Sequence, residues 1–292
     1  MARVGMLPVI VREALGKRTL PREPEPDLVM ADPEQVAAYT EAGRIDGVMA
    51  ASYLFQSAHI SQAIWGCKRV VDIGCGPATQ LAQIAQLNPD VSFLGVDLSD
   101  EMLAQGKRYV SDLGLRNVDF LKADMTDLRD IATGSADGVI STMALHHLPT
   151  RAGLERCFAE IRRIRRSQGA LYLVDFGRLK SLHSVIYFAY MNSANQPHVF
   201  SLDYERSLRA AFLPEEFENL MKDTFGPGHA MFTTYPVPVL ILLKTNTPGN
   251  DNPDMRAHVK RLRHALPTRY RQDLDLIRRL FRLGGLRDDP FR

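Results

Sequence analysis

Short apolar runs alternate with helical stretches along the middle of the chain. Val70–Ile73 is apolar apart from Asp72 and leads into two glycines, Gly74 and Gly76, after which a helical pattern begins. A buried strand that turns tightly into a helix has this pattern. Glycine suits such a turn because it tolerates a positive φ and lets a ligand approach the backbone.

The alternation continues and predicts a parallel sheet whose strands are joined by right-handed crossovers. Further strands are expected at 92–97, 118–122, 138–142 and 170–175, and helices at 78–87, 99–114, 153–166 and 214–225. Segments 230–235 and 239–244 are expected to form a hairpin that closes the sheet. The arginines at the end of the 153–166 helix suit a helix C-terminus better than a phosphate site: Arg162, Arg163, Arg165 and Arg166.

The N-terminal region reads as helices separated by a proline-rich linker. A helix is predicted over 8–16, with Leu7, Ile10, Val11 and Ala14 approximating an apolar face. Three prolines then forbid helix and leave an extended linker at 21–27. Two more helices are expected, from about 32 to 41 and from about 48 to 64.

The segment 181–204 is longer than a strand-to-helix connection needs, and it is apolar and aromatic. It follows a strand whose carboxyl end faces the edge where α/β proteins bind ligands. We expect it to form a substrate lid, within about 178–212. Ordinary helical packing explains half of its apolar residues equally well.

Composition sets wide bounds. The 292 residues are 45% hydrophobic and 24% charged, with a net charge of +2, so nothing indicates bulk attraction to nucleic acid. The three cysteines lack metal-type spacing and predict reduced thiols in a cytoplasmic protein. No apolar run approaches the ~20 residues that span a bilayer, and the N-terminus lacks the features of a signal peptide.

The glycine turn and the acid that ends the next predicted strand, Asp97, are the two halves of a nucleoside-binding unit. The dinucleotide fingerprint needs a third glycine where Thr79 stands, and Pro77 removes an N–H that a pyrophosphate would use. A carboxylate at Asp72 disfavours phosphate and favours a cationic ligand. S-adenosylmethionine is such a ligand, because it carries an ammonium, a sulfonium and no phosphate.

Four motifs in order resemble those of class I S-adenosylmethionine-dependent methyltransferases: Asp72-x-Gly74-x-Gly76, Asp97, Phe120–Met125 and Asp137–Leu148. The last is similar to small-molecule enzymes of the ubiquinone and menaquinone C-methyltransferase type. The resemblance covers roughly 67–244. It implies a doubly wound, Rossmann-like α/β fold of seven strands, the last antiparallel, with an N-terminal helical cap, a lid after strand five and a C-terminal helical extension. The corresponding regions are 1–31 (terminal segment and linker), 32–66 (cap), 67–245 (cofactor-binding domain) and 246–292 (basic extension).

The resemblance also implies roles for individual residues. Asp97 is expected to accept hydrogen bonds from the ribose hydroxyls, and Asp124 from the adenine amino group. The glycines admit the methionine moiety, and Asp72 acts on its ammonium electrostatically or through water. The full set of cofactor-binding candidates is Asp72, Gly74, Cys75, Gly76, Asp97, Leu98, Met102, Asp124, Met125 and Met143. Cys75 is better explained by packing within the turn than by thiol chemistry.

Candidates for substrate contact and catalysis lie around the same edge. The sulfonium already activates the methyl group, so the protein must align an acceptor and, where the acceptor carries a proton, remove it. His146, His147 or Asp175 is the candidate base, and structural roles for the histidines stay open. Adjacent histidines are expected to project in different directions without a carboxylate at metal-ligand spacing, so no metal is predicted. Substrate contacts are expected from Tyr39, Tyr53, Tyr187, Tyr190 and His198.

The tail 255–292 holds eleven Lys and Arg against four Asp, and one of its helices has an apolar stripe that contains Leu274, Ile277, Leu280, Phe281 and Leu283. Docking onto the domain or a second subunit, with the cations solvated, is preferred over peripheral membrane contact. The expected activity is methylation of a small, apolar or aromatic metabolite, with no nucleic-acid partner. Use of another group of S-adenosylmethionine, a nucleic-acid methyltransferase using the tail, and a non-catalytic regulator stay open.

Overall fold

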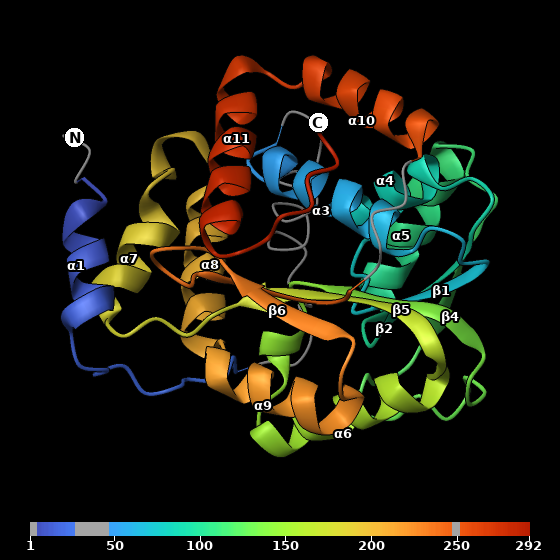
Figure 1. Ribbon diagram of the computed structural model, residues 1–292, viewed down its shortest axis with the longest axis horizontal. Helices are drawn as coiled ribbons and strands as arrows, with labels where there is room; N and C mark the ends of the chain where they lie inside the picture. The colour runs from blue at the N-terminus through green and yellow to red at the C-terminus, as the bar shows by residue number, and fades with distance from the viewer. Residues whose placement is uncertain (1–4, 27–46, 247–251) are drawn as a thin grey trace.

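A seven-stranded sheet organises the computed structural model, which describes residues 5–26, 47–246 and 252–292 (Figure 1). The strand order is β3-β2-β1-β4-β5-β7-β6. Pairing is parallel from β3 to β5, and β7 is antiparallel to both of its neighbours. The predicted Rossmann-like sheet with an antiparallel last strand is therefore confirmed. The strands are β1 (Arg69–Ile73), β2 (Ser92–Asp97), β3 (Val118–Lys122), β4 (Ala136–Thr142), β5 (Arg165–Phe176), β6 (His229–Thr233) and β7 (Leu240–Thr245).

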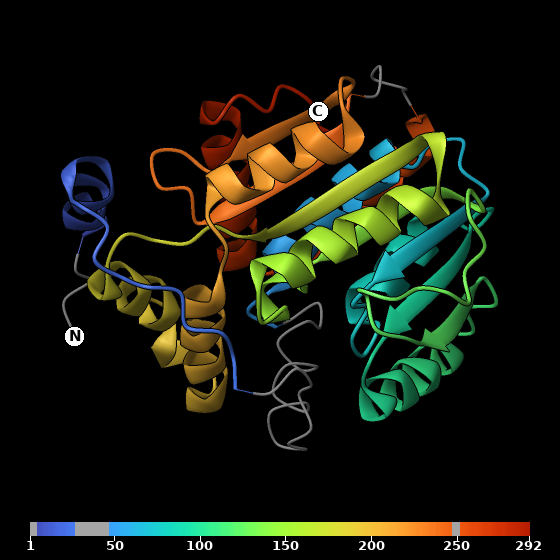
Figure 2. The same ribbon diagram turned by 90° about the horizontal axis from the view of Figure 1, so that it is seen from below.

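Helices cover both faces of the sheet (Figures 1 and 2). One face packs against α3 (Ala50–Ala63), α4 (Thr79–Leu87), α5 (Asp100–Asp112), α10 (Pro253–Ala265) and α11 (Thr268–Leu283). The other packs against α6 (Arg151–Ile164) and α9 (Pro214–Phe225). Among the described residues, no helix is long and apolar enough to cross a membrane.

A third group of helices lies beyond the carboxyl ends of β4 and β5. It comprises α1 (Leu7–Leu15), α7 (Leu182–Tyr190) and α8 (His198–Ala210), with the short 3₁₀ turns η1 (Leu145–His147) and η2 (Ser193–Asn195) nearby. These helices share a separate apolar cluster with Phe176 at the end of β5. The segment expected to form a lid is thus a helical pair placed over the ligand-binding edge of the sheet.

The structure corrects two expectations about local elements. Arg165 and Arg166 do not end a helix, because β5 already begins at Arg165. The Arg165 guanidinium is buried, donates to the Gly169 carbonyl at 2.8 Å and lies over the Phe225 ring. In α1, Val9 and Glu13 are buried whereas Leu7 and Val11 are exposed. Glu13 is buried because its carboxylate accepts the Lys180 backbone N–H.

The C-terminal helices dock onto the domain. The Phe281 ring stacks on Phe55 of α3 with centroids 5.1 Å apart. Several tail cations are paired rather than solvated: Arg278 bridges Asp275 and Asp289, and Arg263 also pairs with Asp275. The tail carboxylate of Asp288 in turn pairs with Lys244 of β7. The helix expected at 32–41, with Tyr39, lies outside the described residues.

Candidate functional site

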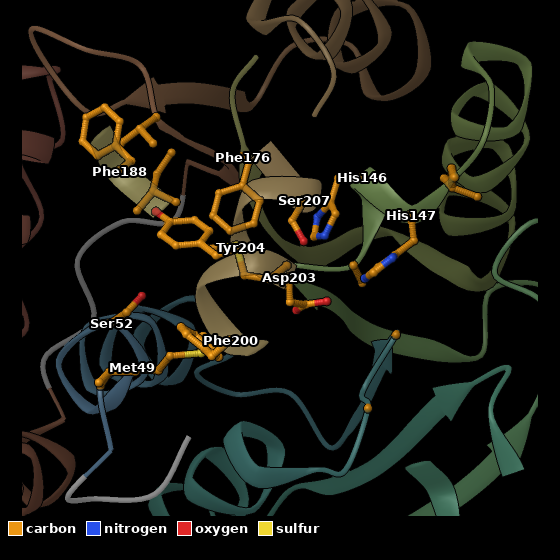
Figure 3. Close-up of a pocket in the computed structure, with 18 of the residues that line it drawn as sticks. Met49, Ser52, His146, His147, Phe176, Phe188, Phe200, Asp203, Tyr204 and Ser207 are labelled. Carbon is orange, nitrogen blue, oxygen red and sulfur yellow. The ribbon is translucent and has the colours of Figure 1, made fainter. Parts of the chain in front are cut away.

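A cavity of about 510 Å³ lies at the carboxyl ends of the parallel strands, between the sheet and the α7–α8 pair. Such edges are where α/β folds bind ligands, because the loops that follow neighbouring strands meet there. Figure 3 shows part of its lining, with α8 supplying several side chains that face the sheet. The tail also contributes to the lining, through Leu276, Ile277 and Leu280 of α11.

The glycine turn after β1 forms one wall. The backbone N–H groups of Gly74 and Cys75 both donate to the Val96 carbonyl, which ties the turn to the end of β2. Gly74 has φ of +72°, and a β-carbon there would lie 2.3 Å from the β-carbon of Ala144. The turn therefore requires glycine at 74 for two independent reasons.

Asp97 ends β2 with its carboxylate at the cavity wall. One oxygen accepts the Gly76 N–H and the other accepts the Ser99 N–H, each at 2.9 Å. Each carboxylate oxygen keeps a further acceptor position. The group is thus held rigidly at the mouth of the turn with acceptor capacity for a pair of hydroxyls.

Asp72 lies behind this wall rather than in it. It is buried, and its Oδ1 has no hydrogen-bond partner. Burial, and secondarily the charge of Asp97, raise its pKa to about 7. A buried carboxylate oxygen with unused acceptor capacity fits a cationic ligand group near the turn.

Eight of the ten predicted cofactor residues line the cavity: Gly74, Gly76, Asp97, Leu98, Met102, Asp124, Met125 and Met143. The carboxylate of Asp124 is held in position by a local turn, because its Oδ1 accepts both the backbone N–H and the hydroxyl of Thr126. Met143 has φ of +54°, an uncommon conformation for a side-chain-bearing residue. The two predicted cofactor residues that do not line the cavity are Asp72 and Cys75. The sulfur of Cys75 lies against Gly95 of β2.

The candidate catalytic residues meet at one side of the cavity. Nδ1 of His146 lies 2.7 Å from Oδ1 of Asp175, and Oδ2 of Asp175 accepts the backbone N–H groups of Leu145 and His146. His146 and His147 line the cavity, whereas Asp175 lies behind His146. The two imidazole rings do not diverge as expected, because η1 brings their centroids to 4.3 Å.

The sequence prediction missed Glu25, which reaches these histidines from the N-terminal linker. Its Oε2 lies 2.9 Å from Nδ1 of His147, and its Oε1 lies 3.8 Å from Nε2 of His146. Burial alone raises the pKa of Glu25, but the hydrogen bond and charge of His147 and the charge of His146 outweigh it and lower the pKa to about 2. No local pattern in a proline-rich linker indicates such a contact, since the partners are distant in sequence.

Glu25 also removes the argument against a metal. One nitrogen of each histidine and one oxygen of Glu25 lie within 4.8 Å of one another, so a carboxylate does accompany the histidines. Two imidazoles and a carboxylate are a donor set that divalent transition metals accept. The described contact between Glu25 and His147 is, however, a direct hydrogen-bonding distance, and the absence of a metal stays a prediction.

The predicted substrate residues that the structure describes lie outside the cavity lining. Tyr53 is buried in α3, Tyr187 packs in the lid cluster, and the Tyr190 hydroxyl donates to Glu205. His198 lies beside the Tyr190 ring. Helical phase is the reason, because other residues of α7 and α8 face the cavity: Phe188, Phe200, Asp203, Tyr204 and Ser207. Met191, which caps α7, lines it as well.

Comparison with known proteins agrees with this geometry. Residues 70–169 match the model of a methyltransferase domain. A malonyl-[acyl-carrier protein] O-methyltransferase from Legionella pneumophila is 30% identical over 110 residues, 38% of this chain and 37% of its own. A trans-aconitate 2-methyltransferase from Deinococcus radiodurans is 37% identical over 81 residues, 28% of each chain. The match thus spans less than two fifths of the length of either relative.

Among solved structures, the plantazolicin methyltransferase BpumL in complex with SAH superposes with a TM-score of 0.55 at 16% identity, covering 82% of this chain and 88% of its own. The similarity in fold thus extends well beyond the segment matched in sequence. The segment 70–169 thus matches a methyltransferase domain, and the fold around it is that of the superposed methyltransferases. The residues at the glycine turn, with Asp97 at its mouth and the buried Asp72 behind it, fit S-adenosylmethionine.

Proposed function

We propose that this protein transfers a methyl group from S-adenosylmethionine to a small, apolar or aromatic metabolite. The observation that carries the proposal is the lining beyond the cofactor residues. It is mainly apolar: aliphatic side chains are joined by the aromatic residues Phe176, Phe188, Phe200 and Tyr204. The polar groups of the lining include His146, His147, Asp203 and Ser207. A mostly apolar pocket with a few convergent polar groups is typical of a small-molecule site.

Charge in the cavity favours a neutral acceptor. Among the lining residues that the structure describes, Arg156 is the one guanidinium or ammonium, and it is exposed. Asp203 lies at the polar edge, and burial followed by the charge of Glu25 raises its pKa to about 6. An anionic acceptor would meet little compensating charge there, whereas an acceptor with one ionisable hydroxyl, amine or acidic C–H would reach the histidines.

Different residues of the cavity have different roles in the proposed reaction. Bound S-adenosylmethionine supplies a methyl group already activated by its sulfonium. Asp97 and Asp124 hold the nucleoside, and Asp72 favours the ammonium. Phe176, Phe200 and Tyr204 exclude water and align the acceptor, which is the entropic part of catalysis.

The proposal is tested with tritiated methyl groups on S-adenosylmethionine and a panel of acceptors matched in size: phenols, aromatic amines, thiols and carboxylic acids. We expect label to pass to at least one aromatic or apolar member. Phe200→Ala should reduce kcat/KM for it by about tenfold or more, the loss of about 1.4 kcal/mol of contact. The exposed lid residue Leu182→Ala serves as the control.

Other outcomes separate the remaining functions. If the tritiated methyl group stays on the cofactor while another group of S-adenosylmethionine appears in the product, the protein catalyses a different transfer reaction. Tight binding of S-adenosylhomocysteine without turnover on any acceptor would indicate a regulator. Label entering tRNA, lost on deletion of the basic tail, would replace the small-molecule proposal with nucleic-acid methylation.

A further inference from the structure

The linker that follows α1 is a docked segment, here called the N-terminal strap (residues 17–26). The backbone N–H groups of Thr19 and Leu20 donate to the Lys180 carbonyl, and that of Glu23 donates to the Arg209 carbonyl. Figure 2 shows the segment running in blue from α1 along the lid helices. Its prolines hold an extended backbone, so successive side chains reach different parts of the domain.

Arg22 fixes the strap close to the histidines. Its guanidinium donates to four backbone carbonyls, those of His146, Leu148, Pro149 and Ala210. The same group lies 3.8 Å above the centroid of the Phe212 ring. A planar guanidinium with this many fixed partners holds one position, and it sets the place of Glu25 three residues later.

Glu25 is enclosed, with 10% of its side chain exposed. One oxygen accepts the Ser207 hydroxyl at 2.8 Å, and the other lies 2.9 Å from Nδ1 of His147. With Nδ1 engaged by Glu25, Nε2 is the nitrogen that His147 has available for the cavity. His146 differs, since its Nδ1 is taken by Asp175 and its Nε2 points toward Glu25 at 3.8 Å.

We infer that Glu25 is a positioning residue that holds His147 as the general base of methyl transfer, an inference that rests on the proposed function. A carboxylate on Nδ1 fixes the tautomer and orientation of an imidazole and stabilises the imidazolium that forms. Asp175 is not the base. It already accepts three backbone N–H groups and the His146 ring.

The step balances without further reactants. A lone pair of the acceptor atom forms the bond to the methyl carbon while the carbon–sulfur bond breaks and leaves its electron pair on sulfur. The acceptor proton moves to Nε2 of His147, which becomes a cation paired with Glu25. The product S-adenosylhomocysteine is neutral at sulfur, and the imidazolium later returns its proton to solvent.

Several charged groups act on His147 from different elements: Glu25 of the strap, Asp175 of β5 and Asp203 of α8, with His146 adjacent on η1. Burial lowers the pKa of His147, but Glu25, then Asp175 and Asp203, outweigh it and raise the pKa. The base is therefore neutral only above an elevated pKa. Removing the Glu25 charge should move the acidic limb of the pH profile to lower pH.

The tautomer is tested without any acceptor. Long-range ¹H–¹⁵N spectra of protein labelled in its eight histidines are recorded above the titration range, with His147→Asn used for assignment. We expect His147 to carry its proton on Nδ1 in the wild type and in Glu25→Gln, whose amide oxygen still accepts. In Glu25→Ala the proton should shift toward Nε2. An Nε2–H tautomer in the wild type, or no change in Glu25→Ala, would overturn the inference.

Turnover on the best acceptor supplies the second readout. Glu25→Ala should lower kcat about 100-fold. Glu25→Gln should lower it about 10-fold and move the acidic limb of the pH–rate profile to lower pH. In both variants the Kd for S-adenosylhomocysteine should change less than about twofold. Glu23→Gln, in the same strap but paired with Arg209, should match the wild type. Unchanged kcat in Glu25→Ala contradicts a positioning role. Loss of activity on chelation, restored by zinc or manganese alone, contradicts it too and makes Glu25 a metal ligand.

The two proposals fail in different ways. If label from S-adenosylmethionine reaches no acceptor, the proposed function fails, and with it the role of His147 as base. The tautomer still reports whether Glu25 orients the ring. If turnover is found but is insensitive to Glu25, only the inference about Glu25 fails.

Discussion

A β-carbon on Gly74 would lie 2.3 Å from the β-carbon of Ala144, closer than two such atoms can approach. Gly74 also has φ of +72°, so Gly74→Ala meets both strain and a clash. We expect this variant to lose about 2–4 kcal/mol of unfolding free energy, measured by urea denaturation.

Gly76 is the matched control for that loss. It has φ of +53° but nothing within 4 Å of an added β-carbon, so Gly76→Ala should cost only about 1 kcal/mol. Equal losses in the two variants would mean that the contact with Ala144 does not constrain the turn. Ligand affinity is not compared, because both glycines line the cavity.

Asp97 should decide nucleoside binding. Both of its oxygens accept backbone N–H groups, so an amide at this position would turn an NH₂ toward a donor and lose charge-assisted bonds to the ribose. Asp97→Asn should weaken S-adenosylhomocysteine binding by about 100-fold or more in calorimetry. Asp119→Asn, an exposed carboxylate of β3, should leave the affinity unchanged.

A thermal shift provides the check on cofactor class. Ligand at a hundred times its Kd adds about 2.7 kcal/mol, a rise of several degrees in Tm. S-adenosylhomocysteine should produce this rise in the wild type and not in Asp97→Asn at the same ligand concentration, whereas NADH should produce none. A rise with NADH alone would contradict the cofactor assignment.

Local patterns were sufficient for the cofactor side of the molecule. The strand 118–122 is predicted with its observed bounds; Gly74 follows β1, Asp97 ends β2 and Asp124 follows β3. Each of these residues is placed by backbone that is close to it in sequence. A motif that folds locally can therefore be read from one sequence.

The acceptor side could not be predicted in the same way. Glu25 meets His147 only because the strap crosses the lid, and a short apolar pattern did not reveal which face of α1 is buried. Residue type alone favours Tyr187 and Tyr190, whereas helical phase turns Phe188 to the cavity, and Met191 at the end of α7 also lines it. Such contacts depend on how distant elements dock, which a single sequence does not record.

Asp72 predicts a pH dependence of cofactor binding. Burial and the charge of Asp97 raise its pKa to about 7 in the unliganded protein, and a bound ammonium would favour its charged form and lower that pKa. Binding must then release a proton below about pH 7. Affinity for S-adenosylhomocysteine should rise between about pH 5 and 7, by up to about tenfold per unit, and level off above.

Calorimetry in two buffers of different ionisation enthalpy measures that proton directly. Asp72→Asn should abolish both the released proton and the slope. An identical slope in Asp72→Asn would assign the pH dependence to another group. The raised pKa of Asp72 also affects folding, because an acid whose pKa is higher in the folded state destabilises that state as pH rises from about 4 to 7. The wild type should therefore lose unfolding free energy over this range relative to Asp72→Asn.

The docking of the C-terminal helices should be visible in stability. Phe281 is 1% exposed and stacks on Phe55, whereas Leu283 on the same helix is 60% exposed. Phe281→Ala should cost about 3–5 kcal/mol, or about 6–10 °C in Tm, because it leaves a cavity between α11 and α3. Leu283→Ala should stay within about 0.5 kcal/mol of the wild type. Small effects in both variants, together with binding of the protein to anionic vesicles, would instead favour a tail that leaves the domain for a membrane surface. The cavity wall formed by Leu276, Ile277 and Leu280 would then exist only while the tail is docked.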